Sequence, residues 1–205
     1  MTLSRRATSA AAAERLVLGM APQPTAVAPQ PRDEADRVVF TVGQRAQPAY
    51  STAVSGVEVR PIRRQELEEL LPLVEGYQRF YGAEPDAERN RRFFSRFLHP
   101  SDDGLLIGAW ANGGLVGFAT LYWFHSSTKA ADTVLMNDFF VREDVRGGGV
   151  GRALIQAALD EARRRGAEHL EWYTGPGNRA AQRLYDSLPG ARRSTWYSYE
   201  IETQD

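Results

Sequence analysis

The 205-residue sequence contains no cysteine, one lysine and only three histidines, which narrows the chemistry open to it. The absence of cysteine excludes disulfides, thiolate metal ligands and a thiol nucleophile. The histidines, His99, His125 and His169, are too scattered along the chain to indicate a ligand cluster. We therefore expect no metal cofactor.

The chain also lacks an excess charge of either sign and a long apolar run. Its 25 basic and 26 acidic residues nearly cancel, so no net field draws it to nucleic acid or to an anionic membrane. No uninterrupted apolar stretch approaches the roughly 18 to 20 residues that cross a bilayer. The first 20 residues resemble a weak export signal, but Glu14 and Arg15 interrupt its apolar part. We expect a cytoplasmic protein without a nucleic-acid or membrane partner.

Two regions of different composition indicate the domain organisation. Residues 1–55 are rich in Ala, Pro, Gln, Thr and Ser and show no sustained hydrophobic period, so we expect a disordered N-terminal extension. A short helix over 7–18 and a strand over 38–42 remain alternatives there. Residues 56–205 have the length and patterning of a single domain.

Within residues 56–205, alternating and helical hydrophobic periods predict a mixed α/β fold. Helices are predicted over 66–82, 86–98, 150–165 and 178–188, the third with a core-facing stripe of Val150, Ala153, Leu154, Ala157, Ala158 and Ala162. Strands are predicted over 57–62, 104–110, 114–124, 133–141, 169–173 and 195–201. The turn Asn112-Gly113-Gly114 predicts an antiparallel hairpin between the second and third of these strands.

A glycine-rich turn lies between a predicted strand and a predicted helix, at Arg146-Gly147-Gly148-Gly149-Val150-Gly151-Arg152. It is no P-loop, because Arg152 follows Gly151 where lysine is needed, and no dinucleotide fingerprint, because position 154 is leucine. The free amides of a helix N-terminus still favour an anion, and Arg146 and Arg152 could add charge. We predict a diphosphate site; the alternative is a loop in which glycine serves only the turn.

Two motifs, in order, resemble those of the GNAT superfamily of N-acetyltransferases. The first is Arg/Gln-x-x-Gly-x-Gly/Ala, matched by Arg146, Gly149 and Gly151, and the second is Asn-x-x-Ala-x-x-Leu/Phe-Tyr, matched by Asn178, Ala181, Leu184 and Tyr185. The stretch 137–151 is most similar to the diamine and polyamine acetyltransferases. Those enzymes usually carry two acidic residues where this chain has Asn137 and Asp138.

The resemblance implies a mostly antiparallel central sheet flanked by helices, with acetyl-CoA as cosubstrate at the strand, glycine turn and helix. The residues that it assigns to acetyl-CoA are Phe139, Phe140, Val141, Arg146, Gly147, Gly148, Gly149, Val150, Gly151, Arg152 and Asn178. Main-chain N–H groups at a bulged or splayed part of the strand near 139–141 would hold the oxyanion, with 171–173 bordering the same site. A homodimer is a further expectation from relatives.

Asp138 and Tyr185 are the candidate catalytic residues. An alkyl amine with a pKa near 10.4 is only about 0.04% neutral at pH 7, so a base must help to remove its proton. Asp138 interrupts an apolar strand and, by resemblance, binds or deprotonates the amine; the alternative is a carboxylate satisfied by backbone or arginine. By resemblance Tyr185 serves the leaving thiolate, through a hydrogen bond or a lowered pKa, since full proton transfer is uphill by roughly 2 kcal/mol. The alternative is a core aromatic.

The acceptor is predicted to be a small primary amine, such as a polyamine, amino acid or aminoglycoside, acetylated directly in a ternary complex. Asn137, Tyr81 and Trp172 are the candidate substrate-binding residues. Aromatic and acidic residues of the first two helices could also hold a cation, although most of the aromatics are at core spacing: Tyr77, Phe80, Tyr81, Phe93, Phe94 and Phe97, with Glu75, Glu84, Asp86 and Glu88. The alternatives are a protein N-terminus or lysine as acceptor, or a non-catalytic acyl-CoA sensor.

Overall fold

The computed structural model describes residues 56–203, so the predicted N-terminal extension, with its alternative helix and strand, lies outside the described residues. The elements of the described part are β1 (Glu58–Pro61), α1 (Leu67–Phe80), α2 (Ala87–Phe94), β2 (Gly104–Ala111), β3 (Gly114–Ser126), β4 (Ala131–Val141), α3 (Val150–Arg164), β5 (His169–Glu171) and α4 (Arg179–Asp186). Single 3-10 turns lie at Arg64–Glu66, Ser95–Phe97 and Glu143–Val145. All four predicted helices are confirmed.

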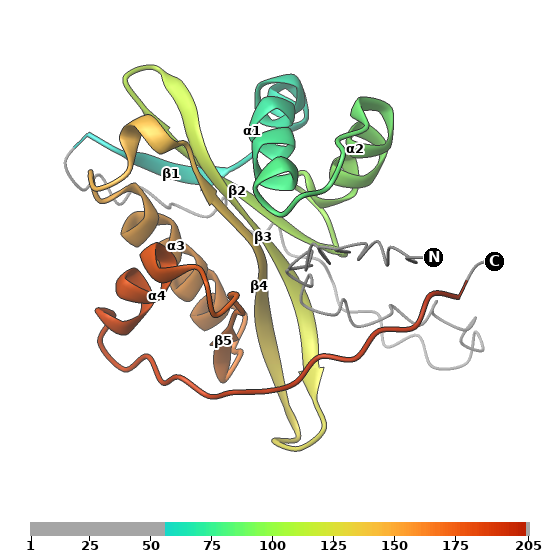
Figure 1. The fold of residues 1–205 in the computed structure, drawn as a ribbon, viewed down its shortest axis with the longest axis vertical. Coiled ribbons are helices and arrows are strands. Elements are labelled where there is room, and N and C mark those ends of the chain that lie inside the picture. Colours follow the sequence, from blue (N-terminus) through green and yellow to red (C-terminus); the bar gives the residue numbers. More distant parts are fainter. Residues whose placement is uncertain (1–55, 204–205) are drawn as a thin grey trace, which may run out of the picture.

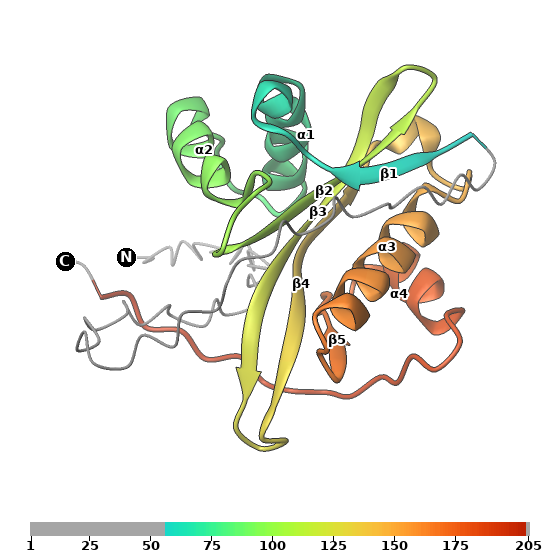
Figure 2. The same ribbon diagram turned by 180° about the vertical axis from the view of Figure 1, so that it is seen from behind.

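The strands form one sheet in the order β1-β2-β3-β4-β5. Neighbouring strands run antiparallel except β4 and β5, which run parallel. Helices α1 and α2 cover one face of the sheet, and α3 and α4 cover the other (Figure 1). The view from behind shows the same three layers (Figure 2). The predicted mixed, mostly antiparallel α/β fold is confirmed.

The β2–β3 hairpin forms at the predicted turn. Asn112 and Gly113 both have a positive φ, at 52° and 81°, which is the backbone of a two-residue type I′ connection. Asparagine and glycine are the residues that tolerate these angles, so the turn fixes the pairing of the two strands. Ala111 accordingly lies opposite Gly114 at the end of the ladder.

A separate hydrophobic cluster lies on each face of the sheet. The six residues of the predicted α3 stripe are all buried, and they pack on residues of β2, β3 and β4. On the opposite face Leu70 and Val74 of α1 pack with Phe94, Phe97 and Phe118. Phe94 and Phe97 are therefore core residues, which confirms the core interpretation of these aromatics.

Strand β4 is irregular on both of its sides, and this irregularity creates the site. Thr120 pairs with Asp138 and Leu121 with Met136, so Asn137 is an extra residue that forms a β-bulge. On its other side β4 pairs with β5 only from Thr133 to Leu135. Within the described residues, the second half of β4 thus has β3 on one side and no strand on the other.

Two strand predictions at the end of the chain need correction. The predicted strand over 169–173 is shorter, since only His169–Glu171 pair with β4. The strand predicted over 195–201 is wrong for the described structure: this segment is extended but belongs to no strand. An alternating pattern favours a strand, but the strand also needs a neighbouring edge, which this segment does not reach here.

Among the described residues no helix is long and apolar enough to span a membrane.

Candidate active site

Asp138 lies at the bulge of β4 and is only 6% exposed. The Asn137 side-chain amide donates to Asp138 Oδ1 over 3.1 Å. The Tyr77 hydroxyl, from α1, hydrogen-bonds the same carboxylate. Thr120, opposite Asp138 in β3, brings its hydroxyl next to the carboxylate without completing a well-aligned hydrogen bond. The backbone-satisfied and arginine-satisfied alternatives for Asp138 therefore do not describe this cluster.

Burial raises the pKa of the Asp138 carboxyl above its usual value, because the charged form loses hydration. The hydrogen bonds from Tyr77 and Asn137, together with the nearby Thr120 hydroxyl, oppose this rise only in part. In turn, burial first and the Asp138 charge second raise the pKa of Tyr77 and Tyr122, so both hydroxyl groups remain neutral. The cluster therefore contains one proton acceptor among neutral hydroxyl and amide groups.

Tyr185 lies on α4 and is half-buried. Helix α4 packs on the face of the sheet opposite to α1 (Figure 1). Its ring packs edge-on against Phe139 of β4 and Trp172 after β5, with centroid separations of 6.0 Å and 5.5 Å. Burial, and next the neighbouring Tyr81, raise the pKa of Tyr185. A lowered pKa is therefore wrong for this residue, and a neutral hydroxyl that donates a hydrogen bond is what the environment supports.

Tyr81 lies between the Asp138 cluster and the helix that carries Tyr185. It follows the last turn of α1, and burial and the Asp138 charge both raise its pKa. Its hydroxyl is hydrogen-bonded to the side chain of Asn178, at the start of α4. Asn178 Oδ1 also accepts from Ala181 N over 3.2 Å, so Asn178 caps α4. Asp138 and Tyr185 thus lie on either side of Tyr81.

The glycine-rich turn has the geometry of an anion site at the start of α3. Gly149 is the N-cap residue, with φ 85°, and Gly147 has φ 84°. Ala153 N, which donates to Gly149 O over 3.0 Å, is the first amide of α3 with an acceptor inside the helix. The preceding helical amides are left for another acceptor, and a Cβ at Gly147 or Gly149 would meet nothing within 4 Å. The turn therefore fits a phosphate-bearing group.

Gly151 has a packing role that the motif alone does not reveal. A Cβ on Gly151 would lie 3.1 Å from Leu184 Cδ2 of α4 and 3.1 Å from Phe139 Cζ of β4. The missing side chain allows α3 and α4 to approach each other beside β4. This glycine thus holds Phe139 and the Tyr185-bearing helix in place.

The two arginines of the turn already have protein partners. Arg146 Nε donates to Val141 O over 3.0 Å, which fixes the end of β4 to the turn. Arg152 donates to Ser187 Oγ over 2.8 Å, beyond the end of α4. Both hold the turn, β4 and α4 together, and both guanidinium groups remain near the start of α3.

Two of the acidic residues near the first two helices stabilise those helices. Glu75 pairs with Arg79 one turn further along α1, at 3.0 Å. Asp86 caps α2 by accepting from Arg89 N over 2.9 Å. Phe80 and Phe93 are largely exposed, so of the aromatic group only Tyr77 and Tyr81 face Asp138. Of this group, Glu75 and Asp86 thus serve α1 and α2, and Tyr77 and Tyr81 lie at the site.

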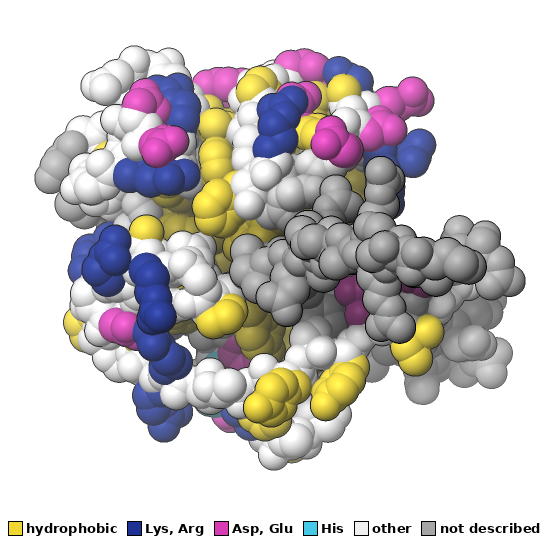
Figure 3. Space-filling view, in the orientation of Figure 1, with side chains coloured by type: hydrophobic (Ala, Val, Ile, Leu, Met, Phe, Trp, Pro, Cys, Tyr) yellow, Lys and Arg dark blue, Asp and Glu magenta, His cyan; other side chains and the backbone are white. Residues whose placement is uncertain are grey.

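The surface over the site is hydrophobic. Figure 3 shows apolar side chains gathered in a hollow between the surface over α1 and the surface over α4.

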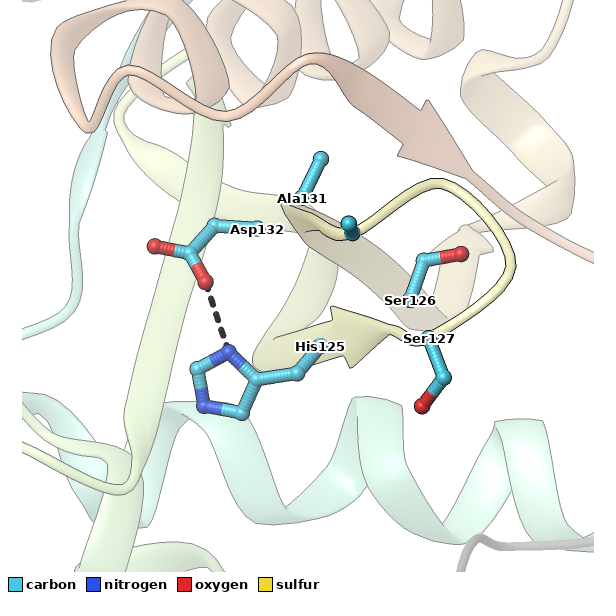
Figure 4. Close-up of a pocket in the computed structure, with 6 residues that line it drawn as sticks. His125, Ser126, Ser127, Ala131 and Asp132 are labelled. Carbon is cyan, nitrogen blue, oxygen red and sulfur yellow. Dashed lines mark hydrogen bonds and ion pairs between the residues drawn. The ribbon is translucent and has the colours of Figure 1, made fainter.

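A separate, shallow pocket lies at the β3–β4 turn, where His125 Nδ1 and Asp132 Oδ1 are 2.6 Å apart (Figure 4). It is lined by none of the candidate catalytic, cofactor-binding or substrate-binding residues. Among the described residues no group of three or more His, Asp or Glu side chains could hold a metal ion.

Comparison with known proteins identifies the family. Residues 70–188 match the Acetyltransferase (GNAT) family, so the chain belongs to that family and is an acetyltransferase. It is 32% identical over 130 residues to the uncharacterized N-acetyltransferase YhfO of Bacillus subtilis, covering 63% of this chain and 87% of the relative. It is 31% identical over 134 residues to the D-amino-acid N-acetyltransferase HPA3 of Saccharomyces cerevisiae, covering 64% and 83% respectively.

A solved structure shows the same fold. AAC(6')-Iy in complex with the bisubstrate analogue CoA-S-monomethyl-acetylneamine superposes with a TM-score of 0.59, covering 72% of this chain and 100% of that chain. The sequence identity is 22%, so this likeness concerns the fold alone. The arrangement of sheet and helices is therefore that of the family to which the sequence belongs.

Three residues around Asp138 carry no sequence signal strong enough to mark them as site residues. Thr120 and Tyr122 read as ordinary members of an apolar strand, and Tyr77 as a member of the core-spaced aromatic group. A weak signal exists for Thr120, which, like Asp138, is a polar residue inside an apolar strand. The pairing of β3 with β4, which places Thr120 opposite Asp138, has no local sequence signal.

Proposed function

We propose that this protein transfers an acetyl group from acetyl-CoA to the primary amine of a small molecule, by direct transfer in a ternary complex. The observation that carries the proposal is the buried Asp138 carboxyl with a raised pKa, connected through Tyr81 to Asn178 and to the neighbourhood of Tyr185. A proton acceptor and a neutral hydroxyl donor thereby flank the half of β4 that lacks a second partner strand.

The donor substrate fits the described residues. The diphosphate of acetyl-CoA would accept hydrogen bonds from the amides at the start of α3, with Arg146 and Arg152 nearby. Its pantetheine arm would follow the main chain of Phe139, Phe140 and Val141, along the side of β4 that β5 leaves open. AAC(6')-Iy, which has this fold, binds a CoA-containing bisubstrate analogue, and this likeness supports the assignment.

In the proposed reaction the ammonium group of the acceptor first loses a proton to Asp138, which yields the nucleophilic amine. The amine nitrogen attacks the thioester carbon, the new C–N bond forms, and the C–S bond then breaks. The oxyanion of the intermediate accepts hydrogen bonds from main-chain amides of 139–141. Tyr185 donates a hydrogen bond to the leaving sulfur, and the second amine proton completes the thiol or passes to solvent.

The acceptor is proposed to be a small cationic amine. Asp138 offers one carboxylate among neutral hydroxyl groups, and Asn137 and Tyr81 complete a narrow polar surface on which an ammonium group fits. Trp172, packed on Tyr185, would border the acceptor on the other side. The action of the relative HPA3 on D-amino acids and the neamine portion of the analogue on AAC(6')-Iy support a small-molecule acceptor.

The test is thiol release from acetyl-CoA with polyamines, D- and L-amino acids, aminoglycosides and short peptides, accompanied by thermal shift with acetyl-CoA. We expect turnover on one small-amine class. Turnover on peptides alone would transfer the proposal to a protein acetyltransferase. Stabilisation by acetyl-CoA without turnover on any amine would overturn catalysis and favour a sensor.

A further inference from the structure

Arg96 is a charged residue to which the proposed reaction gives no role. It lies in the 3-10 turn Ser95–Phe97, which follows α2. Its guanidinium carbon is 5.5 Å from the centre of the Phe97 ring and 5.9 Å from the centre of the Phe93 ring. A cation is attracted to an aromatic ring within roughly 6 Å. The two rings therefore help to hold the guanidinium group in place, although the Arg96 side chain is 54% exposed.

Tyr122 connects Arg96 to the carboxylate of Asp138. Its ring centre lies 5.0 Å from that of Phe97, the ring beside which the Arg96 guanidinium lies. Tyr122 follows Thr120 by two positions along β3, and Thr120 pairs with Asp138. Burial is the main cause of the raised pKa of Tyr122; of the two nearby charges, Asp138 raises this pKa further and Arg96 lowers it. The Tyr122 hydroxyl is therefore close to one negative and one positive charge.

Asp138 and Arg96 lie on the same side of the sheet, the side that α1 and α2 cover (Figure 1). Tyr77 of α1 hydrogen-bonds Asp138, and Phe97 and Tyr122 belong to the hydrophobic cluster on this side. This surface thus has a carboxylate at one end and a guanidinium group at the other. Opposite charges at its two ends match a small molecule that carries both an ammonium group and a carboxylate.

Arg96 already has one protein partner, Asp103, but can still bind another anion. Its Nε and Nη2 atoms each lie 3.1 Å from Asp103 Oδ2. A guanidinium group has five N–H donors, so donors remain for a second acceptor. The Asp103 side chain is 53% exposed, and ion pairs between exposed side chains are weak. A substrate carboxylate can therefore join Asp103 at Arg96 or replace it.

We propose that the acceptor is an amino acid, with its ammonium group at Asp138 and its carboxylate at Arg96. This assignment rests on the acetyl transfer proposed above and adds the residue that selects the acceptor. A guanidinium group binds a carboxylate through short, charge-assisted hydrogen bonds. A diamine would instead bring its second ammonium group toward Arg96, where like charges repel. Arg96 thus favours amino acids over diamines.

The test compares the wild-type chain with Arg96→Gln on three kinds of acceptor: D- and L-amino acids, their carboxamides, and 1,4-diaminobutane. Arg96→Gln should raise KM for the amino acid by about tenfold or more and change kcat little, because the lost contact is away from the reacting nitrogen. The carboxamide keeps the amine but has no negative charge, so its KM should change little. The KM for 1,4-diaminobutane should stay the same or fall. Arg92→Gln, on exposed α2 surface, is the matched control and should leave all these values unchanged.

The outcomes separate this assignment from the proposed acetyl transfer. If Arg96→Gln changes KM equally for all three kinds of acceptor, or leaves KM for the amino acids unchanged, the role of Arg96 is overturned and acetyl transfer stands. Turnover of 1,4-diaminobutane in preference to every amino acid would also overturn it. A chain that acetylates no amine contradicts the proposed function, and calorimetric titration with the same amino acids in the presence of CoA then decides on Arg96. Binding that weakens about tenfold in Arg96→Gln would support the carboxylate site, whereas no binding, or equal binding to both proteins, would overturn it.

Discussion

Asp138 shows how one residue acquires chemistry from its position in a strand. A carboxylate in water would have an ordinary pKa, but the bulge at Asn137 and the pairing with Thr120 place this one under α1, 6% exposed. The resulting loss of hydration raises its pKa and makes it a stronger base when ionised. Tyr77 and Asn137 donate hydrogen bonds that keep part of the charged form available.

Asp138→Asn should lower kcat by about 10²-fold or more, because the amide cannot accept the amine proton. In the wild-type enzyme, kcat/KM should rise with pH through the raised pKa of Asp138, and the variant should lose this rise. Steady-state thiol release between pH 5 and 9 measures both effects. Asp132→Asn, on the exposed turn end of the same strand, is the control and should behave as wild type. A variant with normal kcat and a raised KM would reduce Asp138 to a binding residue.

Tyr185→Phe should lower kcat by about tenfold, the value of one hydrogen bond to the leaving sulfur. Because burial raises the pKa of Tyr185, its ionisation should not appear in the pH profile below pH 10. Stopped-flow or steady-state thiol release across pH checks this. Tyr199→Phe, which removes an exposed hydroxyl, is the matched control. Equal activity of the Tyr185 variant and wild type at every pH would remove this hydroxyl from the mechanism.

At the scale of elements, the site forms where the end of α1, the start of α4 and the end of the β4–β5 pairing meet. Tyr81 is the C-cap of α1, Asn178 is the N-cap of α4, and β4 separates from β5 after Leu135. Gly151 allows α3 to approach Leu184 and Phe139, which sets the position of α4 beside the site. The hydrogen bond between Tyr81 and Asn178 then joins the two helical layers across the open side of β4.

Asn178 has two functions that substitution can separate. Asn178→Ala removes the cap of α4 and should reduce the free energy of unfolding by about 1 kcal/mol. Asn178→Asp keeps a capping oxygen but loses the amide that faces Tyr81, so it should retain stability and show a raised KM for the amine. Chemical denaturation and steady-state kinetics test the pair. If both variants lost stability equally and kept KM, the contact with Tyr81 would have no part in substrate binding.

At the scale of the whole molecule, the buried Asp138 links activity to stability. The pKa of Asp138 is higher in the folded protein than in the unfolded chain. Protonation of Asp138 therefore stabilises the fold. This stabilisation is complete below the unfolded-state pKa and is lost as the pH rises through the folded-state pKa. Above the pKa of the unfolded chain, the raised pKa of Asp138 therefore destabilises the fold. The two hydrophobic clusters, one on each face of the sheet, offset this destabilisation.

Asp138→Asn should consequently make the protein more stable than wild type at neutral pH, and the difference should shrink as the pH falls toward 4. The amide removes the ionisation but can still accept from Tyr77. Thermal unfolding of both proteins between pH 4 and 8 tests this. A stability difference that does not change with pH would indicate that ionisation of Asp138 is not its origin.

Local patterns along the sequence were sufficient to predict most of the secondary structure and the family of this protein. Hydrophobic periods predicted the four helices and the strands of the sheet core, Asn112-Gly113 fixed the hairpin, and the two spaced motifs indicated the family. These features depend on residues close together in the chain, where backbone angles, helix caps and side-chain periods act directly.

Only the tertiary structure decided what surrounds Asp138 and where the chain end lies. Tyr77 and Thr120 are 61 and 18 positions from Asp138, and strand pairing and helix packing bring them together. The predicted strand over 195–201 failed for the same reason, since pairing depends on a distant edge and not on the alternation itself. Burial, which raises the pKa values of Asp138 and Tyr185, is likewise a property of the packed molecule.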